Sequence, residues 1–414
     1  RALLITAAAL GGSVLIPGFP KISLIIIAMG LGTLGYLLQQ NREDEEARVR
    51  SEEKEAAMKE HKPESVIPLV QVDPLEVEIG YSLIPLVDPE QGGTLLDRIT
   101  NIRKRSAIEM GLIVPPIRIR DNMELEPAEY SILIKGVELG TGRLEVGKLM
   151  AMDPGDVEEK MDGDEFTEPV FGLKAIWVGS DARDLAERRG YTVVDCPTII
   201  ATHLTEIIKR HADEILGRQE VQQLIDGLKN DYPAVINELI TEKKMTMGEI
   251  QKVLQNLLRE RVSIRNMVTI LETLATYVNY TKDPGVLTEY VRGALARQIC
   301  KDHVDRNNEL WVITVDPAIE STIRSSIHDD PIEGRVLGLD PESHGAILDS
   351  MLGAYSKARG TVASPVFLVS PAIRSVVFAL LERELHDPIV FSYNEIAPNI
   401  KVNVITSALM TSAA

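Results

Sequence analysis

Two apolar runs separated by a short turn constrain the start of this sequence more than any other feature. The runs span Ala2–Ile16 and Ile22–Leu38, with the turn Pro17–Gly18–Phe19–Pro20 between them. Each run is close to the about 20 residues that a helix needs to cross a bilayer. A signal peptide has one short apolar region and a cleavage site, so we predict instead a transmembrane helical hairpin at residues 1–40. Because the sequence begins at Arg1 rather than Met, we expect it to be part of a longer protein.

A charged tract follows the second apolar run. From Asn41 to Pro68 the sequence is nearly free of large apolar residues, so this tract cannot form a core of its own. We predict a linker at residues 41–72 that separates a membrane part from a soluble part. Cations close behind the second run favour a cytoplasmic exit of the chain, and they are Arg42, Arg48, Arg50 and Lys54.

Composition excludes some classes of function. The chain has 62 acidic and 44 basic residues and a formal net charge of -18, which argues against a nucleic-acid partner. Its two cysteines, Cys196 and Cys300, show no disulfide-like or CxxC spacing, as expected of a reducing compartment. We therefore expect the bulk of the protein to lie in the cytoplasm.

Hydrophobic periodicity divides the soluble part into α/β and helical segments. Alternating strand patterns mixed with helical ones predict an α/β subdomain that is interrupted by a small inserted α/β subdomain. A long series of helical patterns then predicts an all-α subdomain, and renewed strand–helix alternation predicts a C-terminal α/β subdomain. The predicted boundaries of these four subdomains, in the same order, are 73–146 with 196–215, 147–195, 216–303 and 304–414.

Some local patterns allow sharper predictions. Strands are predicted at Leu75–Val87 and Arg143–Met152 from the alternation of apolar side chains. The segment Thr246–Glu249 has the spacing of a capping box at a helix start. The helix after that one is expected to start near Ser263.

Short motifs with a known chemistry are weak in this sequence. The GxGxxG match Gly30–Gly35 lies in an apolar run, where glycines favour helix packing over dinucleotide binding. The segment Gly142–Leu149 resembles a phosphate-binding loop but has Leu149 in place of the magnesium ligand. His203 and Glu206 lack a second ligand pair for a metal, and Cys196 is expected to be a small buried thiol. We predict no catalytic residue, no cofactor and no metal, and hence no enzyme.

Longer stretches carry a resemblance to a known family. Cys196–Gln223 and Thr246–Tyr277 resemble signature stretches of the FHIPEP family of flagellar and type III export gates. Three further stretches add to the likeness, and they are Arg120–Gly140, Glu168–Val178 and Phe391–Ile396. The resemblance covers essentially the whole chain.

The resemblance implies a function in protein export. It implies a multi-pass protein of the bacterial inner membrane whose cytoplasmic part has four subdomains and forms a nonameric homo-oligomeric ring. This ring docks flagellar chaperone–substrate complexes and passes the substrates to the membrane channel. Other implied partners are the export ATPase complex and the substrate-specificity switch protein. The implied chaperone-binding residues, at the junction of the first two subdomains, are Phe171, Glu168, Val194 and Thr202.

Alternatives to this function stay open. The same family includes virulence type III secretion paralogues. A membrane-anchored nucleotide-using enzyme built on the Gly142–Lys148 segment belongs to a different class of protein. For Phe171 the residues alone favour a core position, because a Phe at the entry to a strand is usually buried.

Overall fold

We describe the chain from a computed structural model, in which two compact units span residues 1–72 and 73–414. Nearly all of the predicted hairpin and nearly all of the predicted linker lie outside the described residues. Among the described residues, no helix is both long enough and apolar enough to cross a membrane. The structure describes Thr6, Gly12, Ile26, Met29, Gly30, Gly32, Thr33, 72–155, 157, 159–242, 244–330 and 334–410.

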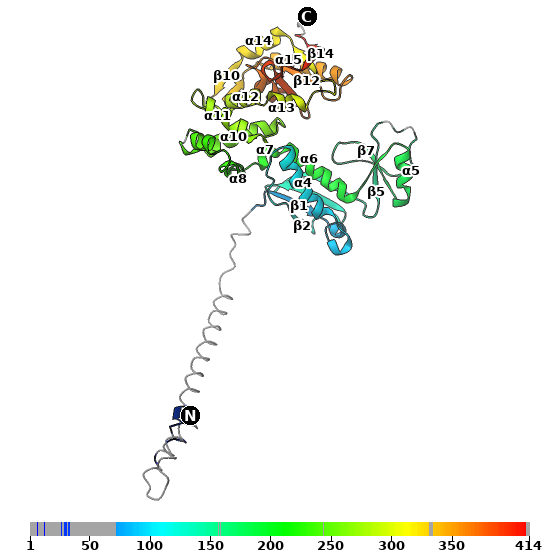
Figure 1. The fold of residues 1–414 in the computed structure, drawn as a ribbon. Coiled ribbons are helices and arrows are strands. Elements are labelled where there is room, and N and C mark those ends of the chain that lie inside the picture. The colour runs from blue at the N-terminus through cyan, green and yellow to red at the C-terminus, as the bar shows by residue number, and fades with distance from the viewer. Residues whose placement is uncertain are drawn as a thin grey trace. The chain divides into compact units, whose positions relative to one another are not determined.

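The second unit begins with a four-stranded sheet in the order β2-β1-β3-β4 (Figure 1). Helices α4 (Leu95–Glu109) and α6 (Cys196–Arg210) pack against each other, and α6 also contacts β4. Their buried faces share one apolar core with the sheet, because α6 places a residue such as Ile200 inward at each turn. The strands are β1 Leu75–Ile79, β2 Arg118–Asp121, β3 Glu129–Ile134 and β4 Val137–Arg143.

Strand β1 is shorter than predicted. The prediction of one strand over Leu75–Val87 is wrong, since a 3-10 helix occupies Tyr81–Leu86. Gly80 marks the change of structure, because a Cβ there would lie 2.1 Å from the Glu126 carbonyl oxygen. The apolar alternation continues through the 3-10 helix, so the sequence pattern alone did not reveal the break.

A second four-stranded sheet is antiparallel throughout, in the order β6-β7-β5-β8. It has a small core of its own around Ile176 and Tyr191, covered by helix α5 (Arg183–Arg188). The predicted strand Arg143–Met152 is wrong, because a turn with Gly147 at φ 86° separates β4 from β5. The strands are β5 Leu149–Met152, β6 Glu165–Thr167, β7 Lys174–Val178 and β8 Thr192–Asp195.

Helices follow one another from residue 212 to residue 301 (Figure 1). The predicted capping box is confirmed, since Thr246 and Glu249 each bond the backbone N–H of the other at the start of α10. The next helix starts at Met267 rather than near Ser263, because the Asn266 side chain caps it. The helices are α7 Ala212–Ile215, α8 Arg218–Leu228, α9 Pro233–Ile236, π-helix η4 Asn237–Thr241, α10 Met247–Arg259, α11 Met267–Tyr277, α12 Pro284–Ala294 and α13 Ala296–Lys301.

A third four-stranded sheet, in the order β13-β12-β9-β14, is parallel throughout. Parallel pairing needs crossover connections, and helices α14, α15 and α16 lie between these strands in sequence. A two-stranded antiparallel ribbon, β10 with β11, precedes α15. The elements are β9 Glu309–Val315, α14 Pro317–Ser325, β10 Ile327–Asp330, β11 Gly334–Leu337, α15 Pro341–Arg359, β12 Val366–Val369, α16 Arg374–Leu381, β13 Ile389–Ser392 and β14 Lys401–Ala408.

These elements agree in type with the α/β, helical and α/β segments expected from the sequence. The boundaries of the four predicted subdomains stay a proposal, which we use below only to name segments.

Candidate functional site

The connection between β6 and β7 presents an aromatic side chain at the surface. Phe171 is 58% exposed, and Leu173 beside it is 38% exposed. The expectation that Phe171 belongs to the core is therefore wrong, and its exposure needs another explanation. Sequence reasoning passed over Leu173, although its place two residues after Phe171 in the same connection could have suggested it.

The Glu168 side chain holds this connection in one conformation. Its carboxylate accepts hydrogen bonds from the backbone N–H groups of Val170 at 2.7 Å, Phe171, and Leu173 at 3.2 Å. Only 2% of Glu168 is exposed, so its charge is satisfied by these donors rather than by water. Gly172 allows the turn, because its φ of 70° disfavours residues with a Cβ. Phe171 is therefore displayed on a closed turn with a buried carboxylate at its centre.

Tyr130 and His203 form a buried aromatic pair whose pKa values are affected by the charge of Glu168. The Tyr130 hydroxyl is 2.9 Å from Nδ1 of His203. Burial raises the pKa of Tyr130, and the charge of Glu168 adds to that rise. Burial lowers the pKa of His203, although Glu168 opposes this change. His203 is therefore a neutral, buried side chain near pH 7.

Val194 and Thr202 lie on either side of the connection from β8 to α6. Both are half-buried, Val194 in β8 and Thr202 in α6. Asp195 between them caps α6 through the Thr198 N–H at 2.9 Å and pairs with Arg98 of α4 at 3.0 Å. Asp195 therefore caps the start of α6 and ties it to α4. That Val194 and Thr202 share a binding surface with Phe171 stays a prediction, and Glu168 lies beneath the surface.

The weak motifs form no site for phosphate or a reactive thiol. Gly142 lies in β4, Lys148 is 3.9 Å from Glu145, and the segment leads into strand β5 rather than into a helix. A phosphate-binding loop needs a helix N-terminus at that point. Cys196 is buried as predicted, and burial raises the pKa of its thiol to about 11. The glycine match Gly30–Gly35 in the second apolar run lies partly outside the described residues.

His203 and Glu206 do not form a metal pair. Glu206 instead accepts a hydrogen bond from Arg261 at 2.9 Å. Within the described residues, Glu206 groups with His386 and Asp387 closely enough to share an ion. Arg261 also pairs with Asp387 at 2.7 Å, so a guanidinium already supplies the positive charge that these carboxylates attract.

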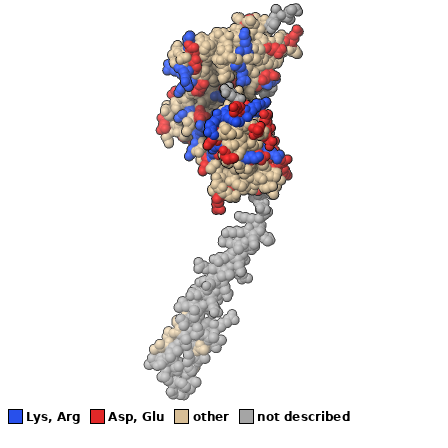
Figure 2. All heavy atoms as spheres, turned by 90° about the vertical axis from the view of Figure 1, so that its right-hand side faces the viewer, with Lys and Arg blue, Asp and Glu red and all other residues tan. Residues whose placement is uncertain are grey.

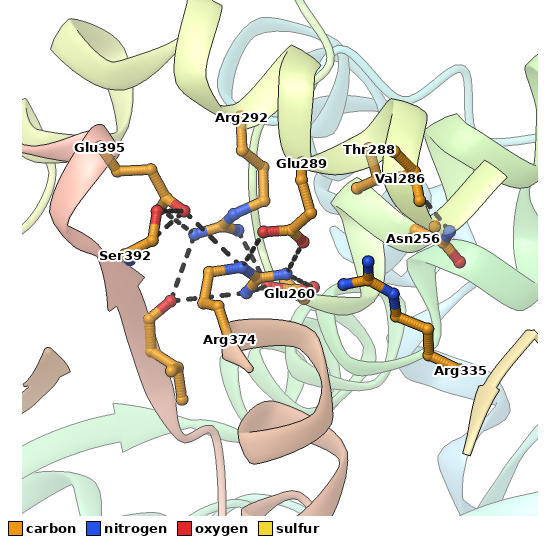
Figure 3. Close-up of polar contacts among 12 residues, drawn as sticks. Asn256, Glu260, Val286, Thr288, Glu289, Arg292, Arg335, Arg374, Ser392 and Glu395 are labelled. Atoms are coloured by element: carbon orange, nitrogen blue, oxygen red, sulfur yellow. Dashed lines mark hydrogen bonds and ion pairs between the residues drawn. The ribbon is translucent and has the colours of Figure 1, made fainter. Parts of the chain in front are cut away.

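A buried cluster of charged residues joins the helical segment to the C-terminal α/β segment (Figure 3). Arg374 of α16 is fully buried and bonds Glu260 at 2.9 Å and Glu289 at 2.7 Å. Arg292 of α12 pairs with Glu260 at 2.9 Å and with Glu395 at 2.5 Å. We call Glu260, Glu289, Arg292, Arg374 and Glu395 the junction cluster. Sequence reasoning missed it, because its members are up to 135 residues apart, from Glu260 to Glu395.

Comparison with known sequences gives consistent matches over most of the chain. Residues 1–401 match the FHIPEP family. The flagellar biosynthesis protein FlhA of Borreliella burgdorferi is 42% identical over 392 residues, which cover 94% of this chain and 55% of that protein. The FlhA of Bacillus subtilis is 43% identical over 371 residues, which cover 89% of this chain and 54% of that protein. The chain thus spans about half the length of these curated relatives.

Solved structures share the fold of the second unit. The Chlamydia pneumoniae CdsV protein is 27% identical with a TM-score of 0.73, and the match covers 82% of this chain and 98% of that one. CdsV in a complex with CdsO matches with a TM-score of 0.71, the same identity and the same coverage. Nonameric EPEC SctV-C, at 23% identity, has a TM-score of 0.66 over 82% of this chain and 99% of that one. The last likeness shows the fold alone.

Proposed function

The chain belongs to the FHIPEP family, and from this premise we propose that it is a component of a flagellar type III protein export gate. The match of residues 1–401 to this family confirms the resemblance of the signature stretches. The flagellar relatives are 42% and 43% identical, compared with 27% for CdsV. Because both curated relatives are named as flagellar biosynthesis proteins, the comparison favours a flagellar protein over a virulence secretion paralogue.

We propose that the part of the chain from residue 73 onward binds chaperone–substrate complexes and hands substrates to a membrane channel. The observation that carries this proposal is the exposed Phe171 on a turn closed by the buried carboxylate of Glu168. A large apolar side chain held in one conformation loses little entropy when a partner covers it. Such side chains are typical hot spots of protein interfaces. Val194 and Thr202 are proposed to extend the contact, and Glu168 to act by holding the turn.

We propose that the chain works by binding and assembly rather than by catalysis. Residues 1–40 would anchor it in the bacterial inner membrane, and 41–72 would help neighbouring copies meet in a ring. Anchoring raises the effective concentration of the copies, which strengthens weak contacts around a ring. The nonameric SctV-C and the CdsV–CdsO complex provide precedents for a ring and for a partner protein. The export ATPase complex and the substrate-specificity switch protein are further proposed partners.

Replacement of Phe171 by Ala tests the binding proposal. We expect about a thirtyfold or larger loss of affinity for a cargo-loaded flagellar chaperone from the same genome, which corresponds to about 2 kcal/mol. The melting temperature should stay the same, because Phe171 is already 58% exposed. Calorimetric titration and thermal melting measure the two quantities.

Tyr280→Ala is the matched control for that replacement, since Tyr280 is 82% exposed on another segment. It should change neither the affinity nor the melting temperature. Intact binding by Phe171→Ala, or equal losses in both variants, would contradict the proposal.

The nucleotide-using alternative predicts a different result. We expect residues 73–414 to bind no ATP, because Lys148 precedes Leu149 and a strand instead of a magnesium ligand and a helix. Saturable ATP binding that Lys148→Ala abolishes would support the alternative in place of the export function.

Ring formation has its own test. In membranes we expect cross-linking to trap oligomers of the full chain, whereas residues 73–414 in solution should be mostly monomeric. Cross-linking that traps monomers alone in membranes would count against the ring.

A further inference from the structure

A groove lies between helix α10 and the C-terminal α/β segment, away from the Phe171 turn in sequence. Its volume is about 600 Å³, within the range of protein binding sites. Apolar side chains, among them Val336 and Val376, line part of it. We call this hollow the α10 groove, defined by Lys252, Asn256, Val336, Val376 and Arg383 among its lining residues.

Basic side chains gather at the α10 groove, although the chain as a whole is acidic. The groove is lined by Lys252, Arg259, Arg335 and Arg383. Arg335 of β11 donates a hydrogen bond to the carbonyl oxygen of Ala372 at 3.3 Å. Elsewhere acidic and basic side chains are interspersed, as on the face displayed in Figure 2. The groove therefore attracts negative charge locally.

Two of these cations are available to a ligand. Lys252 and Arg383 are exposed, and neither has an ion-pair partner among the residues that the structure describes. The acidic residues of the groove are engaged already. Asp283 accepts the N–H groups of Gly285 and Val286 at the start of α12, and Glu289 belongs to the junction cluster.

The shape of the groove favours a peptide over a phosphate-bearing small molecule. A second hollow of about 320 Å³ shares Lys252, Asn256 and Arg259 with it, so the binding surface continues along one face of α10. Phosphate sites usually use free backbone N–H groups at a helix N-terminus. Here the Asp283 carboxylate occupies those of α12 and would repel a phosphate.

We propose that the α10 groove binds an extended acidic peptide segment of a partner protein. Carboxylates of the peptide pair with Lys252 and Arg383, and an apolar side chain of the peptide packs near Val336 and Val376. This site is separate from the Phe171 turn, so a partner can occupy it whether or not a chaperone binds at that turn.

A fluorescein-labelled peptide of alternating Glu and Leu residues tests this site by fluorescence anisotropy. The protein is the compact unit 73–414, since solved relatives consist almost entirely of the matching part. We expect saturable binding that weakens with added salt, because the ion pairs are screened. The double variant Lys252→Glu/Arg383→Glu should weaken binding about tenfold or more. At both positions it replaces attraction of the peptide carboxylates by repulsion.

Lys104→Glu is the matched control, because Lys104 is exposed on α4 and does not line the groove. It should leave binding unchanged, and a peptide with Gln in place of Glu should bind weakly to every protein. The neutral variant Lys252→Gln/Arg383→Gln checks the result if the charge reversals disturb folding. The proposal would be overturned if the Glu/Leu peptide showed no saturable binding, or if Lys104→Glu weakened binding as much as the double variant. It would also be overturned if the Gln peptide bound as tightly as the Glu peptide.

Discussion

Two glutamates with little solvent exposure, Glu260 at 10% of its side chain and Glu168 at 2%, are satisfied by different means. Glu260 pairs with the guanidinium groups of Arg292 and Arg374, which come from distant parts of the chain. Glu168 accepts backbone N–H groups from its own turn. The first arrangement ties two segments together, whereas the second shapes a surface. Burial of a carboxylate therefore does not by itself reveal whether the residue serves the fold or a binding surface.

The largest expected effect is at the junction cluster. Arg374→Ala should lower the free energy of unfolding by about 3 to 5 kcal/mol, because it leaves the largely shielded Glu260 and Glu289 without a full set of partners. Urea unfolding measures this loss. Arg259→Ala is the control, since its pair with Glu382 is half exposed and should contribute less than about 1 kcal/mol. If both variants lost a similar free energy of unfolding, the junction cluster would contribute no more to stability than the exposed Arg259–Glu382 pair.

Mutation of the Phe171 turn should reduce stability less than mutation of the junction cluster, but it should also reduce chaperone affinity. Glu168→Ala should lower the free energy of unfolding by about 1 to 2 kcal/mol, because the released N–H groups can reach water. Chaperone affinity should fall about tenfold or more, since Phe171 is no longer held in one conformation. Glu168→Gln keeps one acceptor oxygen and should lie between the wild type and Glu168→Ala in both measurements. A stability loss as large as that of Arg374→Ala, with binding preserved, would make Glu168 a residue of the fold instead.

Acidification gives the smallest expected effect. Burial lowers the pKa of His203 near the Phe171 turn and of His303 near the junction cluster, where the charge of Arg292 adds to the shift. The folded state therefore binds fewer protons than the unfolded state, and stability present above pH 6.5 is lost as the pH falls below it. Urea unfolding at pH 7.5 and 5.5 should show the loss, and His203→Asn and His303→Asn should each reduce it. An unchanged pH dependence in both variants would exclude these histidines as its source.

The junction carboxylate should respond only at lower pH. Burial raises the pKa of Glu260, but Arg374 and Arg292 outweigh this effect and hold it below the ordinary value of 4.5. The stability that Glu260 contributes is therefore complete above pH 4.5 and is lost as the pH falls further. A fall in stability that starts near pH 6.5 thus reports the histidines. A second fall below pH 4.5 includes the junction cluster together with Asp305 and Asp340, whose hydrogen bonds also lower their pKa values.

Local chemistry was predictable from the sequence where neighbouring residues alone decide the structure. The capping box at Thr246 lies where the pattern placed it, because it depends on residues only three positions apart. The end of β1 was not predictable, since close approach of the Glu126 carbonyl to Gly80 is a tertiary effect. The junction cluster depends on pairs such as Glu260 and Arg374, which are 114 residues apart.

The candidate site was only partly predictable for a related reason. Phe171 was found through the family resemblance, whereas its hydrophobicity alone favoured the core. The role of the Glu168 carboxylate required the turn geometry, because a glutamate in a polar loop is usually exposed. The α10 groove combines five segments of the chain, so no local pattern could indicate it.

The position of β14 in the third sheet affects the order in which the protein can fold during synthesis. Strand β14 pairs with β9, although 85 residues separate the end of β9 at Val315 from the start of β14 at Lys401. When the ribosome has synthesised β9 and β12 but not β14, the nascent chain still exposes one edge of β9. Such an unpaired edge can pair with a strand of another chain. Nascent copies that lie close together on one messenger RNA are therefore at risk of pairing with each other until β14 emerges and covers that edge.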